Sequence, residues 1–316
     1  MRLSNDPDDR ARRKRPAGWR APGPAPRGPD GRPGLAPGPS EVLSFLSGDW
    51  RIFQRRDGHR WSLEDFMTAL VAIEEGRARP PERRVQNACD LGCGIGSVLM
   101  FVAWGFPEAR VAGVEAQEVS LGLARRSLAY NGADDRCTIH AGDLRDRTLL
   151  PAASFDLVTG TPPYIPPGHG TVSAKIQREP CCFETRGGIE DYAAAAARLL
   201  APGGIFVACA GAFPSGRAEA AGRAAGLACT RRVDVIGKEG KPPLFVVAVM
   251  RRAAEVGDEP PRIETFRARL ADGTIPPEMH RARAVLGLPP ADEGQRAAAS
   301  ASPSSGSPAS QATSRA

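Results

Sequence analysis

The sequence predicts an α/β fold in which helices cover both faces of a doubly wound, mostly parallel sheet of seven strands. Two observations carry this prediction. From Val85 onward, short apolar runs alternate with segments of helical periodicity, and repeated strand–helix units build parallel sheets. Within 229–250, only a short Gly/Pro turn separates two apolar runs. A parallel crossover needs about a dozen residues, so this last pair must be antiparallel.

The elements of the alternating region are placed by their apolar runs and the turn residues between them. The predicted strands before the final pair are 86–91, 110–115, 136–140, 154–159 and 204–210. The predicted helices are 96–104, 118–130, 189–200 and 215–226. Two further helices are expected after residue 252, at IETFRARL and MHRARAVL.

A hairpin and a helix are expected ahead of this region. Asp57-Gly58 lies between two short runs, which is a hairpin signal. A helix should begin at Leu63, because Ser62 suits an N-cap and Asp65 stands three residues beyond it, as in a capping box.

Composition divides the chain further. Residues 1–40 are rich in Pro and Gly and carry nine Lys/Arg against four Asp/Glu, which predicts a basic disordered tail. The run RARRKRP within it is either a loose nucleic-acid contact or a solvated arm, and the solvated arm is the commoner case. The remaining divisions are a hairpin and helix over 41–84, the alternating domain over 85–252, helices over 253–289 and a second disordered tail over 290–316.

Several classes of protein are excluded. No apolar run approaches the ~20 residues of a membrane helix, and the N-terminus has no apolar signal core. We therefore expect a cytoplasmic protein with no membrane partner. The seven cysteines are odd in number and form no C-x-x-C pair, which indicates reduced, structural thiols. The four histidines show no ligand spacing, so no metal is expected.

A glycine-rich loop marks a candidate cofactor site. ACDLGCGIG (88–96) ends a predicted strand and begins a helix, where open α/β sheets bind a ligand against a helix N-terminus. Gly92, Gly94 and Gly96 let a ligand approach the backbone closely, and Asp90 precedes them. A glycine loop alone is weak evidence, but further acidic residues follow at informative distances.

Glu115 and Asp143 complete the predicted site. Glu115 ends the next strand, nineteen residues beyond Gly96, which is the range for a carboxylate that accepts from ribose hydroxyls. Asp143 follows the third strand and can accept from an adenine amino group. A nucleotide fold with another adenosyl ligand, such as a dehydrogenase, is the alternative.

These residues resemble the class I S-adenosyl-L-methionine-dependent methyltransferases. DLGCGIG, GVEAQ and AGDL match their first three motifs, and the antiparallel final strand of a Rossmann-like sheet is typical of them. The resemblance implies S-adenosyl-L-methionine as cofactor. It also implies that Asp90 helps to hold the amino-acid end of the cofactor, Glu115 the ribose and Asp143 the adenine.

TGTPPY (159–164) follows the fourth strand, at the carboxyl edge where ligands bind. Family members with Asn, Asp or Ser before Pro-Pro-Tyr methylate planar nitrogens, and acceptors on the nitrogen's N–H groups make its lone pair nucleophilic. Here Thr161 and the carbonyl of Pro162 are the expected acceptors, Pro163 stiffens the turn, and Tyr164 stacks on the substrate. Threonine departs from the family pattern, so a stiff β-to-α turn or an inactive cofactor-binding scaffold is the alternative.

The chain resembles most the tRNA adenine-N6 methyltransferases, over about residues 50–250. The likeness lies in DGHRWSLEDFMTALVA (57–72) and in TPPYIPPGHGTVSAKIQRE (161–179) with the segment after it. This implies an RNA substrate, with tRNA first. The release-factor glutamine methyltransferases are second, because they carry a helical N-terminal domain that the residues before Val85 are too few to build. An RNA substrate requires a local basic face, for which the candidates are Lys175, Arg178, Arg186, Arg231, Arg232, Lys238 and Lys241.

Overall fold

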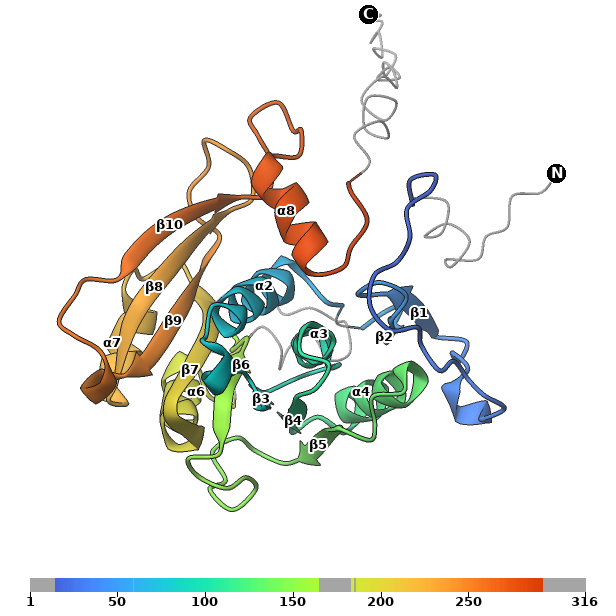
Figure 1. The fold of residues 1–316 in the computed structure, drawn as a ribbon, viewed down its shortest axis with the longest axis horizontal. Coiled ribbons are helices and arrows are strands. Elements are labelled where there is room, and N and C mark those ends of the chain that lie inside the picture. Colours follow the sequence, from blue (N-terminus) through green and yellow to red (C-terminus); the bar gives the residue numbers. More distant parts are fainter. Residues whose placement is uncertain (1–14, 59, 165–182, 185, 292–316) are drawn as a thin grey trace, which may run out of the picture.

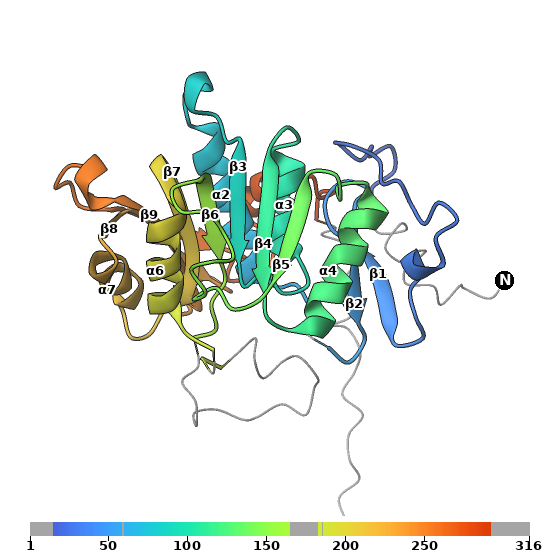
Figure 2. The ribbon, with the colours of Figure 1, turned by 90° about the horizontal axis from the view of Figure 1, so that it is seen from below.

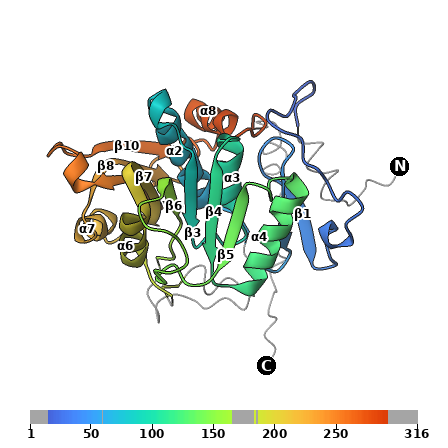
Figure 3. The same cartoon turned by 60° about the horizontal axis from the view of Figure 1, so that its bottom comes forward.

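The computed structural model describes residues 15–58, 60–164, 183–184 and 186–291, and its centre is an eight-stranded sheet. The strand order is β10-β8-β9-β7-β6-β3-β4-β5, and Figure 3 shows the sheet running from β10 at one end to β5 at the other. Strand β9 pairs antiparallel with β7 and β8, whereas the other pairings are parallel. The predicted α/β sheet is confirmed, with one strand more than expected.

The predicted strands and helices of the alternating region are confirmed within a few residues. The strands are β3 (Asn87–Leu91), β4 (Arg110–Glu115), β5 (Cys137–Ala141), β6 (Phe155–Gly160), β7 (Leu200–Gly211), β8 (Leu227–Ile236) and β9 (Phe245–Arg252). The helices are α3 (Ser97–Gly105), α4 (Glu118–Asn131), α6 (Ile189–Leu199) and α7 (Arg217–Ala224). Most of these boundaries follow local signals, because β3, β5, β6 and β7 are apolar runs that end at or directly before a glycine.

The eighth strand corrects the prediction of a helix at IETFRARL. This segment forms β10 (Arg262–Arg267), which pairs parallel with β8. Ile263, Thr265 and Phe266 favour extended backbone, and the edge of β8 supplies the hydrogen-bonding partner. The next predicted helix, MHRARAVL, is confirmed as α8 (Pro277–Val285).

Helices cover the two faces of the sheet as two separate layers (Figure 1). The first layer contains α3, α4, α8 and the N-terminal helix α2 (Leu63–Arg77), whose apolar side chains form one core. The second layer contains α6 and α7, which form the other core. Helix α2 begins as expected, since the backbone N–H of Ser62 donates to the Asp65 carboxylate at 2.8 Å. None of the helices in the described ranges has both the length and the apolar character of a membrane span.

The N-terminal hairpin lies earlier in the chain than predicted. It consists of β1 (Glu41–Phe45) and β2 (Arg51–Arg55), which pack beside α4 (Figure 2). The turn is formed by Ser47 to Trp50, where the Trp50 N–H donates to the Ser47 carbonyl at 2.7 Å. Asp57-Gly58 is therefore not the hairpin turn; the Asp57 carboxylate accepts from Arg55, and the chain continues into α2.

Residues 15–40 correct the prediction of a disordered tail over 1–40. They pack along α4 and include the short 3-10 helix η1 (Pro33–Leu35), whose Leu35 side chain is buried. Arg126 on α4 donates to the carbonyls of Gly34 and Ala36 and forms an ion pair with Glu41 at 2.8 Å. A composition rich in Pro and Gly is compatible with this order, because the α4 surface supplies hydrogen-bonding partners that the segment itself lacks.

Candidate active site

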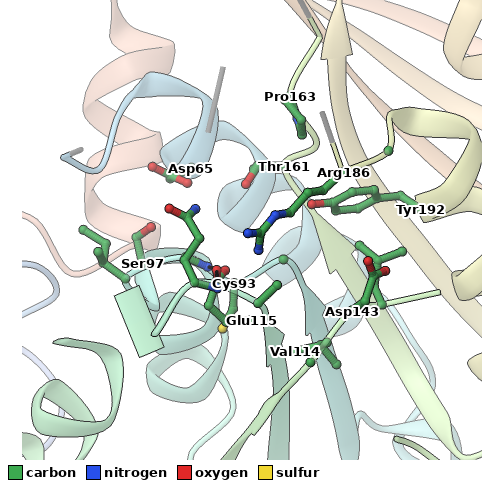
Figure 4. Close-up of a pocket in the computed structure, with 18 residues that line it drawn as sticks. Asp65, Cys93, Ser97, Val114, Glu115, Asp143, Thr161, Pro163, Arg186 and Tyr192 are labelled. Atoms are coloured by element: carbon green, nitrogen blue, oxygen red, sulfur yellow. Dashed lines mark hydrogen bonds between the residues drawn. The ribbon is translucent and has the colours of Figure 1, made fainter. Parts of the chain in front are cut away.

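The carboxyl ends of β3, β4, β5 and β6 meet at one edge of the sheet, and a pocket lies there (Figure 4). Six of the predicted site residues line it: Gly92, Gly94, Glu115, Asp143, Thr161 and Pro163. Asp90, Gly96, Pro162 and Tyr164 lie beside or beneath it. The structure thus brings the predicted cofactor loop and the TPPY segment to the same pocket, although they are far apart in sequence.

The glycine loop has the backbone shape that the sequence requires. Gly92 and Gly94 adopt φ of +58° and +55°, in the left-handed region that favours glycine. A Cβ at Gly92 would collide with the hydroxyl of Tyr192, at 2.1 Å. A Cβ at Gly94 would meet no atom within 4 Å. Gly94 therefore leaves a hollow that a ligand can fill.

Glu115 forms the wall of the pocket at the end of β4. Its carboxylate accepts from the backbone N–H of Gly94 at 2.8 Å and from that of Gln117 at 2.6 Å. Burial raises the pKa of Glu115, and the two backbone hydrogen bonds oppose that rise. These bonds hold the carboxylate at the pocket wall and couple it to the glycine loop.

Asp90 lies beneath the loop, and its side chain does not line the pocket. Its carboxylate accepts from the Thr159 hydroxyl at 2.8 Å and from the Leu99 N–H at 3.1 Å. Burial raises the pKa of Asp90 to about 7, and the negative charge of Asp65 adds to the rise. Asp90 therefore ties β3 to β6 and α3, and its role in holding a cofactor stays a prediction.

Asp143 lines the opposite part of the pocket, after β5. Its carboxylate forms two hydrogen bonds with the Arg145 guanidinium, at 2.6 and 2.9 Å. These bonds lower the pKa of Asp143 and keep it ionised. A carboxylate has about four lone-pair sites, so Asp143 can also accept from a ligand in the pocket.

The four residues of the TPPY segment differ in burial and in their position relative to the pocket. Thr161 is half-buried and lines the pocket with Pro163, whereas Pro162 is buried behind them. The hydroxyl of Tyr164 donates to the Glu64 carboxylate of α2 at 3.0 Å. The Tyr164 ring also lies close to Gly211 at the end of β7. Tyr164 is thus at the rim of the pocket, where α2, β6 and β7 meet.

The lining also includes residues that were not assigned to the pocket from the sequence, among them Asp65, Arg186 and Tyr192. Figure 4 shows the Arg186 guanidinium pointing toward the pocket from the segment before α6. Asp65 carried a local signal, its capping-box position, but no signal of a role in the pocket. The Tyr192 hydroxyl fills the space that Gly92 leaves open. These residues reach the pocket only through the packing of α2 and α6 against the sheet edge.

The proposed basic face is smaller than expected. Arg231 forms ion pairs with Glu74, Glu75 and Glu264, and Arg232 with Glu219 and Asp234. Both arginines therefore hold structural elements together. Lys175 and Arg178 lie outside the described residues, as does most of the segment after Tyr164. Arg186, Lys238 and Lys241 remain as candidates.

The described cysteines fit a structural role. Cys89, Cys93, Cys137, Cys209 and Cys229 form no disulfide with one another. Cys93 lines the pocket, but burial raises the pKa of its thiol well above the usual range, so it stays protonated. Within the described ranges, no group of three His, Cys, Asp or Glu side chains is arranged to hold a metal.

Part of the chain is similar in sequence to known methyltransferases. The model of a family described as "Methyltransferase domain" matches residues 84–225. A release factor glutamine methyltransferase from Caulobacter vibrioides is 34% identical over 183 residues, which cover 56% of this chain and 63% of that protein. A tRNA1(Val) (adenine(37)-N6)-methyltransferase from Porphyromonas gingivalis is 30% identical over 129 residues, which cover 40% and 48%.

A third relative has a different kind of substrate in its name. It is a 4-amino-L-phenylalanine/4-methylamino-L-phenylalanine methyltransferase from Streptomyces pristinaespiralis. It is 34% identical over 143 residues, which cover 43% of this chain and 48% of that protein. The chain therefore spans less than two thirds of the length of each of these three relatives.

Proposed function

We propose that residues 84–225, which match a family described as "Methyltransferase domain", form a class I methyltransferase domain that uses S-adenosylmethionine, and that the protein methylates a planar nitrogen. The observation that carries the proposal is the position of TPPY. Thr161 and Pro163 line the same pocket as Gly94 and Glu115. A substrate held at TPPY would thus lie next to a cofactor held by the glycine loop.

The pocket fits the cofactor. The hollow at Gly94 has the open space and the exposed backbone that a close ligand contact needs. Glu115 offers a buried carboxylate for the ribose hydroxyls, and charge-assisted hydrogen bonds of this kind are strong. The apolar side chains of Ile95, Val114 and Leu144 line the pocket between the loop and Asp143, as suits an adenine ring.

The proposed chemistry needs positioning more than a strong base. When bound, S-adenosylmethionine supplies a methyl group on a positively charged sulfur. A planar nitrogen has a delocalised lone pair and attacks poorly. Hydrogen-bond acceptors on its two N–H groups favour the pyramidal form, whose lone pair is free. The Pro162 carbonyl would provide one acceptor, and the Thr161 hydroxyl the other.

The substrate that we propose is the N6 amine of adenine in RNA, with tRNA first. The relatives support a planar acceptor nitrogen as a class, because a glutamine amide, an adenine amine and an aminophenyl group each carry one. Similarity to a tRNA adenine-N6 methyltransferase supports RNA within that class. Arg186, an exposed cation at the pocket, favours an anionic substrate.

A glutamine side chain of a protein is the second candidate. The observation in its favour is the similarity to a release factor glutamine methyltransferase, which extends over 183 residues. The amide nitrogen of glutamine needs the same two acceptors as an adenine amine. The same pocket could therefore accept either an adenine amine or a glutamine amide, and an assay must decide between these two substrates.

The test is methyl transfer by the purified full-length protein. Isotopically labelled S-adenosylmethionine is incubated with unmodified tRNA or with a release factor, and the digested products are analysed by mass spectrometry. We expect N6-methyladenosine in the tRNA. Methylglutamine in the release factor would replace the first substrate by the second. Transfer to neither, by protein that binds the cofactor, would favour the inactive scaffold.

A further inference from the structure

Arg186 is a positive charge in an otherwise acidic pocket. It lies in the segment before α6, and Figure 4 shows its guanidinium pointing toward the pocket. Among the lining residues that the structure describes, it is the only cation, whereas Asp65, Glu115 and Asp143 are acidic. Arg186 is exposed, whereas only 5% of the surface of Glu115 is exposed. Arg186 therefore lies at the mouth of the pocket, and Glu115 forms its buried wall.

The charge of Arg186 acts on carboxylates in two parts of the pocket. Burial raises the pKa of Glu115, and backbone hydrogen bonds and the charge of Arg186 oppose that rise. The pKa of Asp143 is lowered first by its hydrogen bond to Arg145, and the charge of Arg186 adds to this effect. The guanidinium of Arg186 thus lies near both carboxylates.

Arg217, the first residue of α7, holds the chain on both sides of Arg186. Its guanidinium pairs with Glu184 through Nη1 and Nη2, at 2.5 and 3.1 Å. It also pairs with Glu190, in the first turn of α6, through Nε and Nη2, both at 2.8 Å. The Arg217 and Glu184 side chains are 25% and 13% exposed. Such two-point pairing of a planar guanidinium with a carboxylate fixes geometry as well as adding energy.

The backbone between these two glutamates packs against Arg217. A Cβ at Gly188 would lie 3.0 Å from Nη2 of Arg217 and 3.1 Å from the carboxylate carbon of Glu184. The Gly188 carbonyl accepts from the Asp191 N–H at 3.1 Å. The segment is therefore fastened to α7 on one side and to α6 on the other, and the Arg186 side chain starts from a fixed point.

A phosphate group is the ligand that suits an arginine in this position. The guanidinium fork matches the oxygens of a phosphate in geometry and in charge. An enzyme that methylates a base in a nucleic acid takes the base into a pocket, which leaves the phosphates of the strand outside. Thr161 and Pro163 line the same pocket as Arg186. A base held at these two residues would thus bring a phosphate to the mouth of the pocket.

We propose that Arg186 binds a phosphate of the RNA strand beside the methylated adenosine, and that Arg217 is a positioning residue that holds Arg186 in place. This inference rests on the proposed function. The phosphate does not change charge during methyl transfer, so the contact binds substrate and transition state alike. Its loss should raise KM and leave kcat nearly unchanged.

Steady-state transfer to unmodified tRNA, at saturating S-adenosylmethionine, tests the phosphate contact. Arg186→Ala should raise the KM for tRNA about tenfold, as expected for one charge-assisted hydrogen bond, with kcat within about twofold. Arg186→Lys keeps the charge and should lose less. In a plot of log KM against log salt, Arg186→Ala should lower the slope by about 0.7, because one phosphate contact is lost. Calorimetry should give Arg186→Ala a cofactor affinity within about twofold of wild type.

A double-variant cycle tests whether Arg217 acts through Arg186. Arg217→Ala should raise the KM for tRNA about fivefold. In the Arg186→Ala background the same change should have no further effect, because no side chain remains to be positioned. Arg217→Lys keeps the charge but lacks the planar fork, so its KM should lie between those of wild type and Arg217→Ala.

Arg267 offers a matched control for the loss of an ion-paired arginine. It lies on β10 and, like Arg217, pairs with two glutamates: Glu239 at 3.0 Å and Glu278 at 2.9 Å. It is not one of the residues that line the pocket. Arg267→Ala should lower the thermal midpoint by an amount similar to Arg217→Ala, with the KM for tRNA at the wild-type value.

Each alternative gives a different result. A cofactor affinity that falls about tenfold in Arg186→Ala, with an unchanged KM for tRNA, would make Arg186 a cofactor ligand and overturn the proposal. KM increases that multiply in the double variant would show that Arg217 does not act through Arg186. An equal KM increase in Arg267→Ala would reduce the role of Arg217 to stability. If wild type methylates tRNA and Arg186→Ala matches it, this inference alone is overturned, whereas a wild type that methylates no tRNA overturns the proposed RNA substrate and this inference together.

Discussion

At the scale of single residues, the burial of Asp90 makes stability depend on pH. Its pKa is raised to about 7, first by burial, whereas a carboxyl group in an unfolded chain has a pKa of about 3.9. Between these two values the folded protein binds more protons than the unfolded one. The free energy of unfolding therefore falls as pH rises through this window.

Asp90→Asn should remove this dependence, because an amide does not ionise. The quantity to compare is the free energy of unfolding of wild type minus that of the variant. We expect this difference to fall by a few kcal/mol as pH rises from about 4 to about 8. Urea unfolding at several pH values measures it. The same pH profile for both proteins would show that Asp90 is ionised throughout.

Tyr164 has two separable features, its ring and its hydroxyl. The ring is the proposed stacking surface, and the hydroxyl bonds Glu64 at 3.0 Å. Tyr164→Ala should lower transfer about 10- to 100-fold through lost stacking of ~1–3 kcal/mol, with cofactor affinity retained. Tyr164→Phe keeps the ring and should stay near wild type. Equal losses in both variants would mean that the bond to Glu64, and not stacking, is what the substrate needs.

At the scale of elements, the β3–α3 loop and α4 offer two glycines with contrasting surroundings. Gly94 has φ of +55°, and a Cβ there would fill the hollow of the pocket. Gly122 lies on the exposed side of α4, where a Cβ also meets no atom within 4 Å. A methyl group would fit at both positions. Gly94, however, has a left-handed backbone conformation and lines the pocket, whereas Gly122 is helical and faces away from the protein.

Alanine at these glycines should therefore have opposite effects. Gly94→Ala should destabilise the fold by about 1 kcal/mol and weaken cofactor binding at least tenfold, because the methyl group occupies ligand space. Gly122→Ala should stabilise by about 0.5–1 kcal/mol with unchanged affinity. Thermal unfolding and calorimetry measure both quantities. Unchanged cofactor affinity in Gly94→Ala would argue against the loop as the cofactor site.

At the scale of the whole molecule, residues 15–40 join the N-terminal hairpin to α4. A chain that begins at residue 41 loses buried Leu35 and the carbonyls that Arg126 contacts. Compared with a chain that begins at residue 15, it should be less stable by about 2 kcal/mol. The thermal midpoint should fall by several degrees.

Cofactor affinity is the control for this truncation. The segment lies along α4 and is absent from the pocket lining, so the folded fraction should bind S-adenosylmethionine as tightly as the longer chain. Calorimetry below the thermal midpoint measures it. A large loss of affinity would show that the segment supports the site and not only the fold.

The sequence by itself determined the α/β class, and it predicted the glycine-rich loop and the TPPY segment that the structure brings to one pocket. These depend on local chemistry: Gly92 and Gly94 adopt backbone angles that favour glycine, and each strand of the alternating region is a short apolar run between turns. The antiparallel β9 followed from a connection too short to cross the sheet. Local signals of this kind act between neighbouring residues and do not depend on the rest of the chain.

Only the tertiary structure decided where the remaining segments go. Residues 262–267 become β10 because β8 offers a free edge, although their charge pattern also suits a helix. Residues 15–40 are ordered by the carbonyl contacts of Arg126. Asp65 looked like a helix cap, and the packing of α2 against the sheet edge placed it in the pocket beside Thr161. Each outcome depends on a surface built by distant residues, which no local pattern encodes.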